Sequence, residues 1–169
     1  MPFNIIQNDI TQMRVDAIVN AANTYLMQGG GVCGAIFDAA GAEKLQAACD
    51  RLAPIKTCEA VITPGFNLPA KFIIHAAGPV YDQERAEQCE QQLHTVYFNS
   101  LLLAVKNGCK SIAFPLISSG IYGYPKDEAL KIAISAIRSF LRENEIDVFL
   151  VAFDEATLQA GKDILSGND

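Results

Sequence analysis

The order of apolar and polar stretches along the chain predicts strands and helices in alternation. Helical spacing of apolar residues is clearest between residues 84 and 107, and Gly108 follows that segment as a stop signal. Short apolar runs indicate strands at 3–6, 17–20, 60–63, 72–75, 111–114 and 147–153. Helices are expected at 35–40, 43–52, 84–107, 125–144 and 154–165.

The alternation from residue 60 onward predicts a mostly parallel sheet with helices on both faces. The first strand or two need not follow this rule, so we expect a mixed sheet. Pro125 and Asp154 stand at the starts of the last two helices, where proline and aspartate are favoured. In such sheets, ligands bind beyond the carboxyl ends of the strands.

Length and composition indicate one domain, residues 1–169, with enough apolar material for one core. No apolar run approaches the ~20 residues that cross a bilayer, and the first residues lack a secretory pattern. Five scattered cysteines without a Cys-x-x-Cys pair favour reduced thiols in a cytoplasmic protein. The net charge of −6 argues against binding to nucleic acid or an anionic membrane.

Two glycine-rich segments each follow a predicted strand and precede a predicted helix. They are Gly29-Gly30-Gly31-Val32-Cys33-Gly34 and Ser118-Ser119-Gly120-Ile121-Tyr122-Gly123. Glycine lets the backbone approach a ligand closely, and free N–H groups at a helix start attract phosphate. Each loop alone is more often a simple turn. Two such loops facing each other would hold both phosphates of a diphosphate, and neither matches a P-loop or a dinucleotide-binding fingerprint.

The whole set of motifs resembles the macrodomain family, most closely its MacroD-type and bacterial O-acetyl-ADP-ribose deacetylase-like branch. The resemblance implies a three-layer α/β/α fold with a mixed six-stranded sheet. It also implies binding of ADP-ribose and hydrolysis of ADP-ribose esters, either O-acetyl-ADP-ribose or mono-ADP-ribosylated proteins, without a cofactor. The segments that carry it are 8–11, 16–23, 29–32, 73–79 and 115–125.

The resemblance assigns roles to individual residues. Asp9, beside Ile10, corresponds to an acceptor for the adenine amino group, and a turn residue is the alternative. Asn23 corresponds to a ribose contact, whereas Asn20 is expected to tie its strand to neighbouring strands. Phe153 corresponds to a wall for the adenosine half, with core packing as the rival interpretation. The phosphate loops comprise Gly30, Gly31, Val32 and Gly34, and Ser118, Ser119, Gly120, Ile121 and Tyr122, with Tyr122 covering the distal ribose.

The candidate catalytic positions are Asn23, Gly31 and Cys33. The resemblance implies that catalytically active MacroD-type members carry the segment Gly-Gly-Val-Asp-Gly, in which the aspartate helps to activate water. This chain has Cys33 at the position of that aspartate. A neutral thiol is a poor substitute for a carboxylate as an acceptor.

Three interpretations of Cys33 follow. In the first, the phosphate of the substrate, Asn23 and the loop backbone orient the water, because preorganised donors are often the larger catalytic contribution. In the second, the protein is a non-catalytic ADP-ribose-binding module. In the third, Cys33 is a nucleophile, although no histidine is near in sequence.

Other candidate chemistry is sparse. His75 ends an apolar strand and is expected to be a structural histidine, while His94 has no identifiable partner. Asp9, Asp16 and Asp38 do not show the spacing of metal ligands, so no metal is predicted. RNA is a minor alternative as a ligand. Dephosphorylation of ADP-ribose 1″-phosphate is a close chemical alternative to ester hydrolysis.

Overall fold

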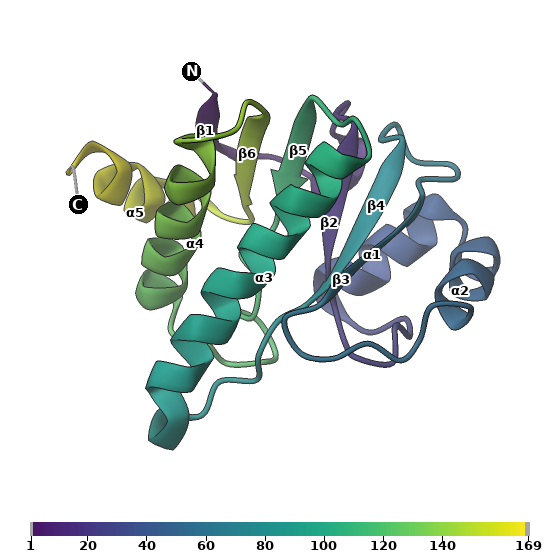
Figure 1. The fold of residues 1–169 in the computed structure, drawn as a ribbon, viewed down its shortest axis with the longest axis horizontal. Coiled ribbons are helices and arrows are strands. Elements are labelled where there is room, and N and C mark those ends of the chain that lie inside the picture. Colours follow the sequence, from purple (N-terminus) through teal and green to yellow (C-terminus); the bar gives the residue numbers. More distant parts are fainter. Residues whose placement is uncertain (1, 168–169) are drawn as a thin grey trace.

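The computed structural model describes residues 2–167, which form one six-stranded sheet with helices on both sides (Figure 1). The strands lie in the order β1-β6-β5-β2-β4-β3. Their bounds are β1 Phe3–Gln7, β2 Ala17–Ala22, β3 Ala60–Pro64, β4 Phe72–Ala77, β5 Ser111–Phe114 and β6 Asp147–Ala152. All neighbouring pairs are parallel except β3 with β4.

The antiparallel strand is β3, not one of the first two strands, where the sequence led us to expect the exception. A short connection over residues 65–71 joins β3 to β4, and Gly65 N donates to Lys71 O at 2.8 Å. A connection this short leaves no room for a crossover helix, so the two strands must form a hairpin. β3 is also an edge strand and only partly buried, although the apolar run over residues 60–63 is typical of a buried strand.

Two apolar cores lie on opposite faces of the sheet, because side chains alternate along each strand. Ile18 and Ile73 face α1 and α2, whereas Val19 and Ile74 face α3, α4 and α5. Figure 1 shows α3 and α4 across one face, with α1 and α2 on the other side. The helices are α1 Gly31–Ala40, α2 Ala42–Asp50, α3 Ala86–Lys106, α4 Lys126–Leu141 and α5 Glu155–Ser166. The predicted three-layer α/β/α fold is confirmed.

Local signals set most helix ends. Asp154 accepts from Thr157 N at 2.8 Å and begins α5, as predicted. The helix α4 ends at Leu141, before the expected Asn144. Asn144 folds back instead, and its side-chain amide donates to Phe140 O at 3.1 Å. This side chain satisfies one of the last carbonyls of the helix.

The carboxyl ends of the parallel strands all meet at one edge of the sheet. The segments that follow these strands, at 8–9, 23–30, 78–82, 115–125 and 153–154, therefore gather at that edge. Both glycine loops belong to this set. Among residues 2–167, no helix is long and apolar enough to span a membrane.

Candidate functional site

The first glycine loop turns directly into helix α1. Gly30 is the residue before the helix, which begins at Gly31. Within residues 2–167, the backbone N–H groups of Gly31, Val32 and Cys33 have no acceptor, as expected for the first turn of a helix. These donors and the positive end of the helix dipole together favour an anion.

Close packing holds this loop in shape. A Cβ atom placed on Gly34 would lie 2.6 Å from Gly29 O, so the loop backbone passes where a side chain would be. Gln28 adds a second restraint, because its side-chain amide donates to Gly34 O at 3.3 Å and to Asp38 Oδ1 at 3.0 Å. The free N–H groups of the first turn are therefore held in position before any ligand arrives.

The second glycine loop follows β5 and is closed by its own backbone. Gly123 N donates to Gly120 O at 3.0 Å, and Tyr124 N donates to Ser118 O at 2.9 Å. The N–H groups of Gly120, Ile121 and Tyr122 find no acceptor in the part of the chain that the structure describes. The loop therefore presents a second set of free donors. Ser119 supports the turn through its hydroxyl, which donates to Leu116 O at 2.8 Å.

The two loops face each other. A Cβ atom on Gly30 would lie 3.9 Å from Ile121 Cδ1. Ile121 is 86% exposed, so its side chain stands above the loops and is not packed in the core. Burial raises the pKa of the Tyr122 hydroxyl, and the nearby Cys33 thiol raises it further. The sequence predicted two opposed loops, and these contacts bring them together.

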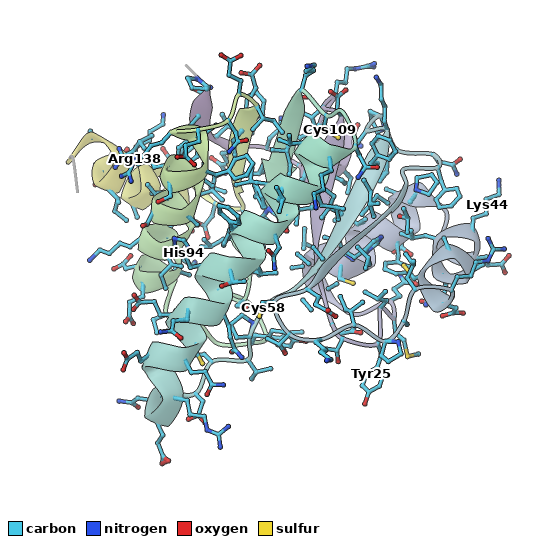
Figure 2. All side chains as sticks on the ribbon, in the orientation of Figure 1. Tyr25, Lys44, Cys58, His94, Cys109 and Arg138 are labelled. Carbon is cyan, nitrogen blue, oxygen red and sulfur yellow. The ribbon has the colours of Figure 1, made fainter. Side chains whose placement is uncertain are left out.

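Asn23 shapes the segment that leads into the first loop. Its side-chain amide donates to Met27 O at 2.9 Å, and its oxygen accepts from Met27 N at 3.1 Å. The same amide nitrogen faces Gly29, whose added Cβ would lie 3.9 Å away. An asparagine amide has two N–H groups, so one remains for a further partner. Tyr25, in the turn that Asn23 closes, points out into solvent (Figure 2).

Cys33 lies in the first turn of α1 with its side chain buried. Its thiol points to Met27 O at 3.8 Å, which is the geometry of a weak S–H donor. His75 Nε2 lies 3.8 Å from Cys49 Sγ, so this histidine contacts the thiol of Cys49 and not that of Cys33. A thiol in this position is held by a carbonyl and is not paired with a base.

The residues assigned to adenine lie just beyond the carboxyl ends of β1 and β6. Asp9 Oδ1 accepts from Thr11 N at 3.0 Å and from Thr11 Oγ1 at 2.7 Å, so the turn interpretation holds for this oxygen. Asp9 Oδ2 has no partner among the described residues and remains free to accept. The side chain of Ile10 is 4% exposed and packs in the core, which leaves only its backbone accessible. Phe153 is 92% exposed, so core packing is excluded for it.

The Macro domain family model matches residues 19–133, a span that includes both glycine loops. The chain belongs to the macro domain family.

Individual relatives cover nearly the whole chain. An O-acetyl-ADP-ribose deacetylase of Escherichia fergusonii is 48% identical over 159 residues, covering 90% of this chain and 88% of the relative. A solved variant of the Oceanobacillus iheyensis macrodomain with ADPR is 40% identical, with a TM-score of 0.92 over 98% of this chain and 92% of that one. The same macrodomain with ADP is 41% identical, again with a TM-score of 0.92, over 98% and 90%.

His75 has a structural role in this macro domain, as the sequence predicted. It is buried, and its Nδ1 lies 3.0 Å from Asn20 Nδ2 while its Nε2 lies 3.0 Å from Thr63 Oγ1. Because an amide nitrogen can only donate, Nδ1 is the acceptor and the proton sits on Nε2. Burial lowers the pKa of His75 to about 4, so the ring is neutral. The predicted tie between Asn20 and its neighbouring strand is confirmed by the same contact.

Sequence reasoning gave no role to the segment after β4, which lies beside the second glycine loop. A Cβ atom on Gly78 would lie 2.4 Å from Ser118 Oγ and 2.5 Å from Ile117 Cγ2. Farther along, Tyr81 N donates to Tyr122 O at 2.9 Å. Gly78, in the 73–79 motif, was the available signal for this close approach.

A cavity of about 570 Å³ opens beside this segment, outside the two glycine loops. In residues 2–167, no three His, Cys, Asp or Glu side chains lie together in a way that would hold a metal ion. All five cysteines are free thiols.

Proposed function

We propose that this macro domain binds ADP-ribose, with its diphosphate between residues 29–34 and 118–123. The observation that carries the proposal is the pair of opposed donor sets, the first turn of α1 and the backbone at 120–122. Backbone donors and a helix N-terminus bind phosphate without formal positive charge, which agrees with a net charge of −6. The solved relatives with ADPR and with ADP support the same ligand class.

The strand order gives the ligand a direction. Gln7 pairs with Ala152 in the sheet, so the residues just after them, Asp9 and Phe153, lie at the same edge. In the proposal, Asp9 Oδ2 accepts from the adenine amino group and the exposed Phe153 ring packs against the adenosine half. The distal ribose lies at the other end, under Tyr122 and next to the remaining N–H of Asn23.

We further propose that the protein hydrolyses an ester on the distal ribose. Water attacks the acyl carbon, the bond from that carbon to the ribose oxygen breaks, and a carboxylic acid and ADP-ribose leave. The Cys33 thiol already donates to Met27 O, so the proton of the water passes to a phosphate oxygen of the substrate and from there to the departing ribose oxygen. Asn23 and the Gly31 N–H orient the reacting groups, and no metal or cofactor takes part. The deacetylase name of the Escherichia fergusonii relative supports this reaction class.

A non-catalytic ADP-ribose-binding module is the second candidate function. The observation that favours it is Cys33 itself, because its buried thiol stands at the position that corresponds to an aspartate in active MacroD-type members. The two functions separate in one experiment, in which the protein is incubated with O-acetyl-ADP-ribose and with a mono-ADP-ribosylated protein. The enzyme releases ADP-ribose from at least one of them. Calorimetric binding of ADP-ribose without any product would establish the binding module instead.

The Cys33→Ser variant tests whether the thiol takes part in the chemistry. The serine hydroxyl can keep the hydrogen bond to Met27 O, whereas it cannot replace a thiolate nucleophile. We expect turnover of O-acetyl-ADP-ribose to stay within about twofold of the wild type, because the phosphate is the proposed base. A loss of a hundredfold or more with unchanged ADP-ribose affinity would show that Cys33 reacts.

A further inference from the structure

A polar groove lies next to the proposed ADP-ribose site and has no part in the function described so far. It occupies about 570 Å³, which is in the range of ligand pockets. One wall is the segment after β4 and the other is the first two turns of α3. The lining residues are Thr57, Pro79, Val80, Tyr81, Asp82, Gln83, Arg85, Gln88, Cys89 and Gln92.

The groove is joined to the second glycine loop. Tyr81 belongs to the groove, and its N–H donates to Tyr122 O at 2.9 Å. The ring of Tyr81 also packs on Tyr124, with 4.8 Å between the ring centroids. In the proposed function, Tyr122 covers the distal ribose, so the groove begins beside the ribose that carries the ester. The acyl group that is esterified to that ribose therefore lies next to this groove.

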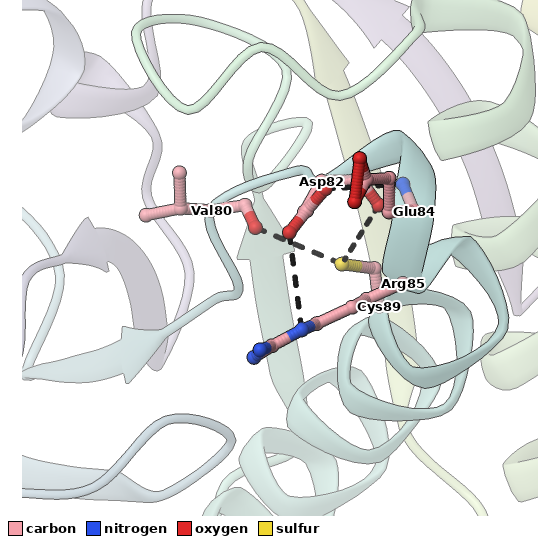
Figure 3. A network of polar contacts seen from close by, with 5 residues as sticks. All are labelled: Val80, Asp82, Glu84, Arg85 and Cys89. Atoms are coloured by element: carbon pink, nitrogen blue, oxygen red, sulfur yellow. Dashed lines mark hydrogen bonds and ion pairs between the residues drawn. The ribbon is translucent and has the colours of Figure 1, made fainter.

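The groove wall has a defined shape (Figure 3). The Cys89 thiol points to Val80 O at 3.6 Å and to Asp82 O at 4.0 Å, which fastens the segment after β4 to α3. Asp82 Oδ1 accepts from Glu84 N at 3.0 Å, and its other oxygen lies 3.9 Å from Arg85 Nε. The wall is thus held by contacts within the protein.

The groups that line the groove match a polypeptide. Gln83, Gln88 and Gln92 each carry an amide that both donates and accepts, as Thr57 does through its hydroxyl. A peptide backbone offers the complementary N–H and C=O groups at every residue. An acetyl group offers one carbonyl and a methyl group, and it would leave most of the groove empty.

The charge around the groove selects among polypeptides. Residues 79–92 contain four carboxylates and one cation. Asp82 and Arg85 line the groove and lie beside each other, whereas Glu84, Glu87 and Glu90 belong to the same segment but lie outside the lining. All four carboxylates are on exposed residues. An acidic surface attracts a basic segment and repels an acidic one, chiefly at low salt.

We propose that this groove binds the polypeptide segment that carries the ADP-ribose ester, with a preference for lysine or arginine beside the modified side chain. The inference rests on the proposed function, because that function places the distal ribose under Tyr122. Within that function it selects ADP-ribosylated proteins with basic residues beside the modified side chain, and it assigns the surface that distinguishes them from O-acetyl-ADP-ribose.

The test uses two variants of the same helix. Gln88→Trp fills the groove, while Gln91→Trp places the same side chain on an exposed position of α3 that does not line it. For each protein, kcat/KM is measured with O-acetyl-ADP-ribose and with a peptide carrying ADP-ribose on a glutamate between two lysines. Gln88→Trp is expected to lower the ratio of peptide to O-acetyl kcat/KM about tenfold, a change of 1.4 kcal/mol. Gln91→Trp is expected to leave the ratio unchanged. Equal ratios in all three proteins would overturn the inference.

A binding experiment keeps the inference testable if neither substrate turns over. Affinities are measured for ADP-ribose and for hydrolysis-resistant ADP-ribosyl peptides with lysine or glutamate flanks. The lysine-flanked peptide is expected to bind about fivefold more tightly than the glutamate-flanked one at low salt, and Gln88→Trp removes the advantage. If ADP-ribose binds but the peptides add no affinity, the groove inference fails and the proposed ligand stands. If ADP-ribose itself does not bind, the proposed function fails as well.

Discussion

Gly34 shows how a single residue can fix the start of α1. The carbonyl of Gly29 passes 2.6 Å from the place that a Cβ atom would occupy. Real Cβ atoms do not come so close to backbone oxygen, so any other residue displaces the loop. Because the free N–H groups of residues 31–33 follow directly, their aim depends on this contact.

Replacing Gly34 by alanine should therefore weaken ligand binding more than it weakens the fold. We expect Gly34→Ala to reduce ADP-ribose affinity about tenfold or more, because donors displaced from the phosphate lose charge-assisted hydrogen bonds. Isothermal titration calorimetry measures the affinity, and Ala35→Ser, at the next and exposed position, serves as the control. Unchanged affinity in Gly34→Ala would mean that the phosphate does not lie on this helix start.

At the scale of single residues, the sequence predicted the glycine loops well and their neighbours less well. Gly30 and Ile121 were placed on opposite sides of a cleft, and the structure brings them together. Phe153 could have been core or surface on sequence grounds, because an aromatic residue at a strand end suits both. Its exposure was decided by where β6 ends, one residue earlier.

At the scale of elements, His75 joins three strands through one ring. Asn20 on β2 donates to its Nδ1, and Nε2 on the other side of the ring faces Thr63 on β3. Thr63 in turn donates to Pro64 O at 3.2 Å. The ring is neutral in this chain of contacts, and a proton on Nδ1 would remove the acceptor of Asn20.

The stability of the sheet should depend on pH through this residue. Burial lowers the pKa of His75 to about 4, from 6.5 for an ordinary histidine. Between these values the unfolded chain binds a proton that the folded protein does not. The stability that neutral His75 contributes to the fold is therefore complete above pH 6.5 and is lost as the pH falls to about 4. This loss amounts to about 3 kcal/mol of unfolding free energy.

Urea unfolding at pH 7 and at pH 4 measures this effect. The wild type and His94→Gln should show the full decrease, because His94 is not part of the contact chain. His75→Gln should be less stable at pH 7 and should lose about 3 kcal/mol less on acidification. The same pH dependence in His75→Gln and in the wild type would assign it to other groups.

The order of helices and strands was predictable because each element carries its own periodicity. The direction of β3 was not predictable, since a strand has the same apolar pattern whether it runs parallel or antiparallel to its neighbour. The length of the connection over residues 65–71 was the useful signal, because a connection this short has no room for a crossover helix. The groove beside α3 was also beyond prediction, because its lining comes from Thr57, the segment after β4 and a helix face.

At the scale of the whole molecule, an acidic protein is proposed to bind an anionic ligand. Residues 29–34 and 118–123 contain no lysine or arginine, and the net charge is −6. The proposed attraction comes from partial charges on backbone N–H groups at hydrogen-bond distance. Such contacts are short-ranged, so salt screens them much less than it screens charges separated by a Debye length.

The affinity for ADP-ribose should therefore depend weakly on ionic strength. We expect it to change less than about threefold between about 50 and 500 mM salt, as measured by calorimetry. A parallel titration with single-stranded RNA is expected to show no binding, because counterion release requires clustered cations. A steep fall in ADP-ribose affinity with salt would point to lysine or arginine side chains as the main phosphate ligands.

The hydrogen bond from Tyr81 to Tyr122 would make the proposed ADP-ribose site and the proposed peptide groove, the two halves of the substrate surface, thermodynamically interdependent. A ligand part that immobilises Tyr81 also restricts the loop that bears Tyr122, and the converse holds with the same free energy. Occupancy of one half thus lowers the entropic cost of ordering the other. A substrate that spans both halves would gain cooperativity, and after cleavage each fragment would dissociate more readily than the intact molecule.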